Sequence, residues 1–154
     1  MAALTRRFDT AGLLVLRLVG GVLIALHGYP KLTMGPANFG RTTLDSLGVP
    51  APVLMGYVVT FVELGGGILL VLGLLTRLAA LALSLNMIGT TLLTKVGVGL
   101  ISPRMAGAEL DLMYLAAFLA LLVMGAGAAS LDRLIGLDRG HGPRRRSREP
   151  ATAS

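Results

Sequence analysis

The architecture of this chain follows from one apolar run, Gly56-Tyr-Val-Val-Thr-Phe-Val-Glu-Leu-Gly-Gly-Gly-Ile-Leu-Leu-Val-Leu-Gly-Leu-Leu-Thr-Arg77. The run is long and apolar enough to cross a bilayer, because roughly 20 predominantly apolar residues span the hydrocarbon core. Near its middle it carries a carboxylate, Glu63, beside three consecutive glycines. A charged side chain in hydrocarbon costs at least a few kcal/mol, so such a residue usually faces a protein interior and has a partner. The rest of the chain is therefore expected to supply a partner for Glu63.

The composition places the chain among membrane proteins. Of its 154 residues, 54% are hydrophobic and only 14% are charged, whereas a soluble domain carries about 25% charged residues. At roughly 20 residues per crossing, the chain has room for four helices with short connections, and therefore for one domain. The sequence has no cysteine, which excludes disulfides and thiol redox chemistry at the chain's own residues.

The net charge of +6 comes mainly from the end of the chain. An Arg-rich stretch follows the last apolar segment and has the composition of a disordered tail. We therefore predict a membrane domain over 1–133 and a disordered cytoplasmic tail over 134–154. Contact with anionic lipid, or control of topology, accounts for these arginines without a nucleic-acid partner.

Four apolar segments predict an all-α fold, a four-helix transmembrane bundle. The helices are expected near 11–29, 53–75, 78–96 and 108–126. A cleaved signal peptide is the alternative for the first segment, but Arg17 interrupts its apolar region and no small-residue cleavage site follows. The tight corner at Thr76-Arg77 makes the second and third helices an antiparallel hairpin. The segment 29–52 is rich in proline and glycine, which indicates a long connection, and within it 39–47 could form a short interfacial helix.

One face of the first helix carries polar residues at two levels, with small residues between them. Helical spacing brings together Arg17, Gly20, Gly21, Ile24, His27 and Gly28. Small residues let helix backbones approach closely inside a membrane. We therefore expect Gly20 and Gly21 to pack against a neighbouring helix. Gly66 and Gly67, from the glycine run beside Glu63, are expected to do the same.

The depth of each polar residue can be compared at about 1.5 Å of rise per helical residue. Glu63 lies 11 positions after Pro52, about 16 Å from the outer end of its helix. Arg17 lies 12 positions before Tyr29, about 18 Å from the outer end of the first helix. Asn86 is about 12 Å from the inner end of the third helix, within reach of a long arginine side chain. We therefore predict a buried polar layer of Arg17, Glu63 and Asn86.

A second polar level is expected nearer the outer surface. It combines His27 and Lys31 of the first helix with Glu109 and Asp111 of the fourth, and Lys95 lies at the same level. His27, Glu109 and Lys31 are the candidate catalytic residues, because a histidine beside a carboxylate suits proton exchange. The alternative for both layers is structural, with ion pairs that only fix the register of the helices. No two histidines lie at matching depth, so neither haem nor a metal site is predicted.

The distribution of basic residues predicts that both termini lie in the cytoplasm. With the N-terminus inside, the cytoplasmic side collects Arg6, Arg7, Arg77, Arg133, Arg139, Arg144, Arg145, Arg146 and Arg148. The other side has only Lys31, Arg41, Lys95 and Arg104. An excess of Lys and Arg marks the cytoplasmic loops of membrane proteins.

The chain contains a series of short motifs, in order His27-Gly28-x-x-Lys31, Gly48-Val-Pro-x-Pro52, Glu63-x-Gly-Gly66, Gly73-x-x-Thr76-Arg77, Glu109, and Gly125-x-Gly127-x-x-Ser130-Leu-Asp132. Together they resemble the DoxX family of small bacterial membrane proteins. The resemblance runs from about Leu13 to Arg133 and implies a four-helix protein of the bacterial cytoplasmic membrane. Some relatives are linked to thiosulfate:quinone oxidoreduction, or to membrane redox complexes with soluble partners in oxidative-stress defence. The motif near Gly125 departs from the more usual Gly-Pro-Gly turn, which leaves the geometry of that turn open.

Three functional hypotheses follow. The first is a membrane subunit associated with redox chemistry, which would bind a quinone or redox protein partners. The second is a non-catalytic scaffold or assembly factor in the bilayer, in which the buried charges only hold the fold. The third is a small transporter, which four helices without an obvious inverted repeat support little. Self-association into a homo-oligomer is compatible with each, and whether the chain is an enzyme by itself stays open.

Overall fold

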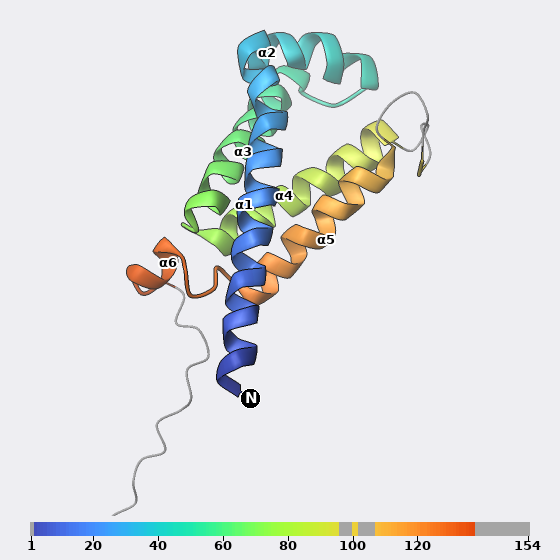
Figure 1. Ribbon diagram of the computed structural model, residues 1–154. Coiled ribbons are helices and arrows are strands. Elements are labelled where there is room, and N and C mark those ends of the chain that lie inside the picture. The colour runs from blue at the N-terminus through green and yellow to red at the C-terminus, as the bar shows by residue number, and fades with distance from the viewer. Residues whose placement is uncertain (1, 96–99, 102–106, 138–154) are drawn as a thin grey trace, which may run out of the picture.

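The computed structural model describes residues 2–95, 100–101 and 107–137. Most of the predicted tail, from residue 138 on, lies outside these ranges. The elements in chain order are α1 (Ala2–Met34), α2 (Pro36–Phe39), the π-helical turn η1 (Gly40–Leu44), the 3₁₀ turn η2 (Asp45–Leu47), α3 (Pro52–Leu72), α4 (Thr76–Thr90), the π-helical turn η3 (Thr91–Lys95), α5 (Ala108–Met124) and α6 (Leu131–Leu134) (Figure 1). The predicted all-α class is confirmed, since the described ranges contain helices and no strand.

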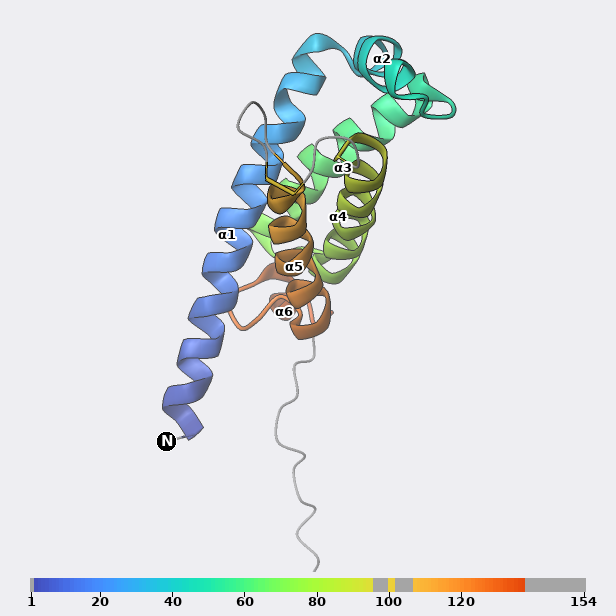
Figure 2. The same cartoon turned by 90° about the vertical axis from the view of Figure 1, so that its right-hand side faces the viewer.

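Three of the described helical segments are long and apolar enough to cross a membrane. They are Ala11–Met34, Pro52–Leu72 and Thr76–Leu93. The fourth predicted crossing corresponds to α5, whose 17 residues are at the short end of the range of about 17–25 residues for a spanning helix. α5 packs along α4, and α3 contacts both α1 and α4 (Figure 2).

The first helix is longer than predicted, because it continues past Pro30 to Met34. A proline removes one backbone hydrogen bond and strains the preceding turn, which is why the sequence suggested an end at Tyr29. The helix has only one more turn to complete after Pro30, and Lys31 in that turn is held by an ion pair with Glu63. α3 in turn ends earlier than predicted, at a left-handed Gly73 with φ +66°.

Glycines bring α1 and α3 into close contact. A Cβ added to Gly21 would lie 2.8 Å from the carbonyl oxygen of Gly67, and one added to Gly67 would lie 2.8 Å from the Ala25 nitrogen. Gly66 faces α4 instead, where an added Cβ would lie 3.0 Å from Leu83. Gly20 is less confined, with Phe118 at an ordinary 3.8 Å. The close approach of α1 to α3 therefore depends in part on Gly21 and Gly67.

The outer surface of the bundle is apolar on every long helix. Val19 of α1, Phe61 of α3, Leu85 of α4 and Val123 of α5 are each more than half exposed. Large apolar side chains on the outside, with charged ones inside, reverse the pattern of a soluble protein and suit a lipid environment.

Short helical turns cover one end of the bundle. The segment Pro36–Leu47, which we term the cap, lies across the beginning of α3 (Figure 1). Its Gly40 sits against Gly56 of α3, where an added Cβ would be 2.9 Å from the Gly40 nitrogen. The predicted connection therefore contains helical turns, and it places Leu44 in the interior. The opposite end holds the α3–α4 corner and α6 (Figure 2).

Candidate functional site

The structure places Arg17 away from Glu63, so the predicted grouping of Arg17 with Glu63 is wrong. The Arg17 side chain is 1% exposed. It donates hydrogen bonds to the backbone carbonyls of Leu70 (3.0 Å), Ala126 (2.5 Å) and Ala129 (2.9 Å). The last carbonyls of a helix have no partner within the helix. Arg17 therefore ties the end of α3 to the segment that follows α5.

The error lies in the depth assigned to Arg17. Measured from Met34, where α1 ends, Arg17 is 17 positions down its helix, about 26 Å. Glu63 remains 11 positions, about 16 Å, from Pro52. The two side chains are therefore separated by roughly two helical turns along the bundle.

Asp132 forms further hydrogen bonds at the same end of the bundle, at the corner between α3 and α4. Its carboxylate accepts hydrogen bonds from the backbone nitrogens of Leu75 (2.6 Å) and Thr76 (2.8 Å), and its own nitrogen donates to Gly73 (2.9 Å). The carboxylate caps the start of α4 and supports Leu75, which has a left-handed backbone with φ 48°. We term Arg17 and Asp132 the corner clasp, since together they hold the α3–α4 corner.

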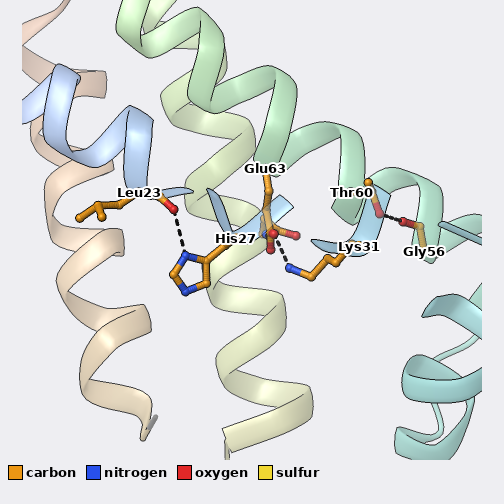
Figure 3. Close-up of polar contacts among 7 residues, drawn as sticks. Leu23, His27, Lys31, Gly56, Thr60 and Glu63 are labelled. Carbon is orange, nitrogen blue, oxygen red and sulfur yellow. Dashed lines mark hydrogen bonds and ion pairs between the residues drawn. The ribbon is translucent and has the colours of Figure 1, made fainter. Parts of the chain in front are cut away.

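Glu63 has two partners near the cap end of the bundle. Lys31 of α1 forms an ion pair with one carboxylate oxygen, and Asn86 of α4 donates to the other at 3.2 Å (Figure 3). The contact between Glu63 and Asn86 agrees with the expectation from depth. The Glu63 side chain is 3% exposed and that of Lys31 is 21% exposed. The Lys31 ammonium also lies 5.5 Å from the centre of the Phe39 ring in the cap.

His27 contacts its own helix and an aromatic ring rather than a carboxylate. Its Nδ1 is 2.9 Å from the Leu23 carbonyl oxygen (Figure 3). A carbonyl only accepts, so Nδ1 carries the proton and Nε2 is an acceptor in the neutral ring. The edge of the ring packs on Tyr114 of α5, with centroids 5.8 Å apart.

Glu109 is separate from His27, so the predicted pairing of these two residues is not observed. One carboxylate oxygen of Glu109 is buried, and no described residue forms a hydrogen bond with it. Asp111, one of the predicted members of this level, accepts a long hydrogen bond of 3.5 Å from Thr91. The side chain of Lys95 lies outside the described part of the chain.

Most of these groups line one cavity of about 190 Å³. Its polar lining consists of His27, Lys31, Thr43, Glu63, Thr90, Asp111 and Tyr114. These residues come from α1, η1, α3, α4 and α5, so every long helix and the cap contribute. We term this space the polar cavity.

Three polar residues of the cavity, Thr43, Thr90 and Tyr114, were not selected by the sequence analysis. Thr43 belongs to the connection, where no regular spacing linked it to the helices. Tyr114 lies one helical turn after Asp111, on the same face of α5, and that spacing was a usable signal. Together the lining residues provide an ammonium, carboxylates, a phenol and hydroxyls, which can bind and protonate the oxygens of a small polar group.

These features define a helical membrane protein whose cavity is lined in part by polar residues, and comparison with known proteins gives its family. The DoxX family model matches residues 12–96, and the chain belongs to the DoxX family. "Putative oxidoreductase CatD" of Bacillus subtilis (strain 168) is 31% identical over 126 residues, covering 80% of this chain and 87% of the relative. "Uncharacterized membrane protein Rv3486" of Mycobacterium tuberculosis (strain ATCC 25618 / H37Rv) is 34% identical over 127 residues, covering 77% of each chain.

The name of a third relative also describes a membrane protein. "Inner membrane protein YphA" of Escherichia coli (strain K12) is 33% identical over 130 residues, covering 79% of this chain and 88% of the relative. No solved structure matches the chain. The family match includes Lys31, Glu63 and Asn86 but ends before α5, which contributes Asp111 and Tyr114 to the cavity.

Proposed function

We propose that this protein is a membrane subunit of a redox system that binds the head group of a quinone in the polar cavity and exchanges protons with it. The observation that carries the proposal is the placement of Glu63. This carboxylate is almost fully buried within apolar helices, yet it lines a cavity and is held by Lys31 and Asn86. Ionisable groups inside a membrane are costly and commonly mark ligand or proton pathways.

The chemistry of the lining suits a quinone. Reduction of a quinone to a quinol takes two electrons and two protons, one proton for each carbonyl oxygen. The Lys31 ammonium and the Tyr114 hydroxyl can donate hydrogen bonds to such oxygens. In this proposal the His27 imidazole, which also lines the cavity, exchanges protons with the head group.

The electrons come, in this proposal, from a protein partner. The chain has no cysteine, so it cannot supply a dithiol as the electron donor. One relative is named as an oxidoreductase, which supports a redox setting for the family but names no substrate. The protein then acts as the quinone-binding subunit, and a second protein supplies the reducing equivalents.

The proposal includes an orientation in the membrane. All four long helices cross the bilayer, with both termini in the cytoplasm and the cap outside. The beginning of α1 and α6 lie at the same end of the bundle, which supports this arrangement (Figures 1 and 2). Arg77 and Arg133 are at that end too, as expected for a cytoplasmic face. Residues 1–133 form the membrane domain and 134–154 form a basic tail.

Binding of a quinone with a minimal side chain to the purified protein tests the proposal. We expect the wild type to bind either a benzoquinone or a naphthoquinone in nanodiscs, and Lys31→Met to reduce the affinity about tenfold or more, the equivalent of one lost charge-assisted hydrogen bond. Arg41→Met is the matched control, since it removes a positive charge from the cap without lining the cavity. Absence of binding by the wild type, or equal losses in both variants, contradicts the proposal.

A scaffold role is the second candidate, and the corner clasp favours it. Arg17 and Asp132 are both buried, and both form hydrogen bonds that shape the backbone. If the Lys31–Glu63 pair had the same purpose, its loss would lower stability without changing any quinone affinity of the protein that still folds. The binding assay above therefore separates the two candidates.

A further inference from the structure

An apolar groove of about 360 Å³ lies beside the polar cavity, between α3 and α4. Its walls include Met55, Val58 and Val62 of α3, Ala82 and Leu85 of α4, and Leu93 of η3. Val58 is 44% exposed and Leu85 is 61% exposed. The groove therefore opens on the outer apolar surface of the bundle, where lipid surrounds the protein.

The groove and the polar cavity are adjacent and share part of their walls. Leu44, Val59 and Thr90 line both spaces. Asn86 lines the groove while its amide donates to Glu63, which lines the cavity. The end of the groove next to the cavity is therefore polar, and the rest of the groove is apolar.

The volumes of the two spaces suit different parts of one ligand. Pockets that hold small molecules commonly measure about 300–1,000 Å³, so the polar cavity, at about 190 Å³, holds only a compact head group. The groove adds about 360 Å³ of apolar space next to it. A ligand that fills both must have a small polar head and a long apolar chain.

We infer that the groove between α3 and α4 binds the apolar chain of a membrane-dissolved ligand whose head occupies the polar cavity, and that the ligand reaches the cavity sideways from the bilayer. Asn86 and Thr90 form the junction between head and chain. The nature of the head rests on the proposed function, whereas the path of the chain rests on the groove itself.

A second apolar groove, between α1 and α5, is the competing route. Its volume is about 400 Å³, and it meets the polar cavity at Leu110 and Tyr114. On that side the rings of His27 and Tyr114 are packed edge to face, and Tyr114 stacks on Phe118. On the α1–α5 side the shared wall consists of a leucine and an aromatic ring, whereas the α3–α4 side has the Asn86 amide, a group that can contact a polar head.

Gly89 allows a direct test. It lines the α3–α4 groove, and a Cβ added there meets no atom within 4 Å. Gly89→Leu therefore fills the groove without forcing the helices apart. Gly65→Leu is the matched control, because Gly65 has the same open surroundings on α3 but does not line the groove.

The experiment compares quinones with a minimal and a long isoprenoid side chain, at equal mole fraction in nanodiscs containing the full chain. We expect Gly89→Leu to weaken binding of the long-chain quinone about tenfold and to leave the short-chain quinone unchanged. Gly65→Leu should affect neither. A quinone with a photoreactive group at the chain end should label α3 or α4.

The outcomes separate this inference from the proposed function. If the short-chain quinone fails to bind the wild type, the proposed head site is wrong and the inference falls with it. If the short-chain quinone binds but Gly89→Leu leaves the long-chain affinity unchanged, only the groove is wrong. Labelling of α1 or α5 by the photoreactive chain places the chain in the competing groove and overturns the inference.

Discussion

Replacing Lys31 and Glu63 singly and together should show that they are energetic partners. Lys31→Met leaves the Glu63 carboxylate buried with only Asn86 as a partner. Breaking a buried pair costs about 3–5 kcal/mol, and we expect about 3 kcal/mol because the Lys31 side chain is 21% exposed. Glu63→Met should cost less, about 1–2 kcal/mol, since the Lys31 ammonium can reach water.

The double variant provides the decisive comparison. Because neither charge is left alone, Lys31→Met with Glu63→Met should be less harmful than the sum of the singles, with a coupling of about 1–3 kcal/mol. Arg17→Met with Glu63→Met is the control pair. Those two residues share no partner and lie about two helical turns apart, so their effects should add within about 0.5 kcal/mol.

The assay is reversible unfolding in mixed micelles, with loss of helical circular dichroism followed as the denaturing detergent is increased. The free energy of unfolding is then compared across the two cycles. Coupling of Arg17 to Glu63 that equals or exceeds the coupling of Lys31 to Glu63 would refute the assignment of partners.

Two further predictions concern packing and orientation. Gly21→Val should destabilise the bundle by at least about 1–3 kcal/mol in the same unfolding assay, because its Cβ would meet the Gly67 carbonyl at 2.8 Å. Gly12→Val is the control and should be close to neutral, since Gly12 has open surroundings. Equal effects of the two substitutions would contradict the packing argument. For orientation, a membrane-impermeant thiol reagent should label Thr42→Cys but not Ser154→Cys in intact cells, and labelling of Ser154→Cys from outside would reverse the proposed topology.

The helices could be predicted from the sequence because each is an apolar segment bounded by glycine, proline or charge. The start of α3 is the clearest case, since the helix begins at Pro52, next to the predicted position, although it ends at the left-handed Gly73, before the predicted end at 75. The end of the first helix could not be predicted in the same way. Pro30 ordinarily marks a boundary, but here the tertiary contact of Lys31 with Glu63 follows it.

The misplaced end of the first helix explains which contacts of the site could be predicted and which could not. The position of Glu63 was counted from Pro52, a boundary that the structure retains, and its contact with Asn86 was anticipated. Arg17 was counted from Tyr29, five positions before the true end of α1, and was therefore placed more than a turn too high. Thr43 could not be predicted, because its approach to the cavity depends on how the cap folds over α3.

The hydrogen-bond capacity of Arg17 and Lys31 supports a division of roles between the ends of the bundle. A guanidinium has five N–H donors, and Arg17 directs four contacts at backbone carbonyls, including a long one of 3.4 Å to Val71. An ammonium has three donors, and Lys31 uses one on Glu63. The remaining donors of Lys31 lie at the polar cavity, whereas Arg17 has almost no capacity left for a ligand. The sequence contains both cations in one apolar helix, but only their partners distinguish a charge that shapes the backbone from one that is available for binding.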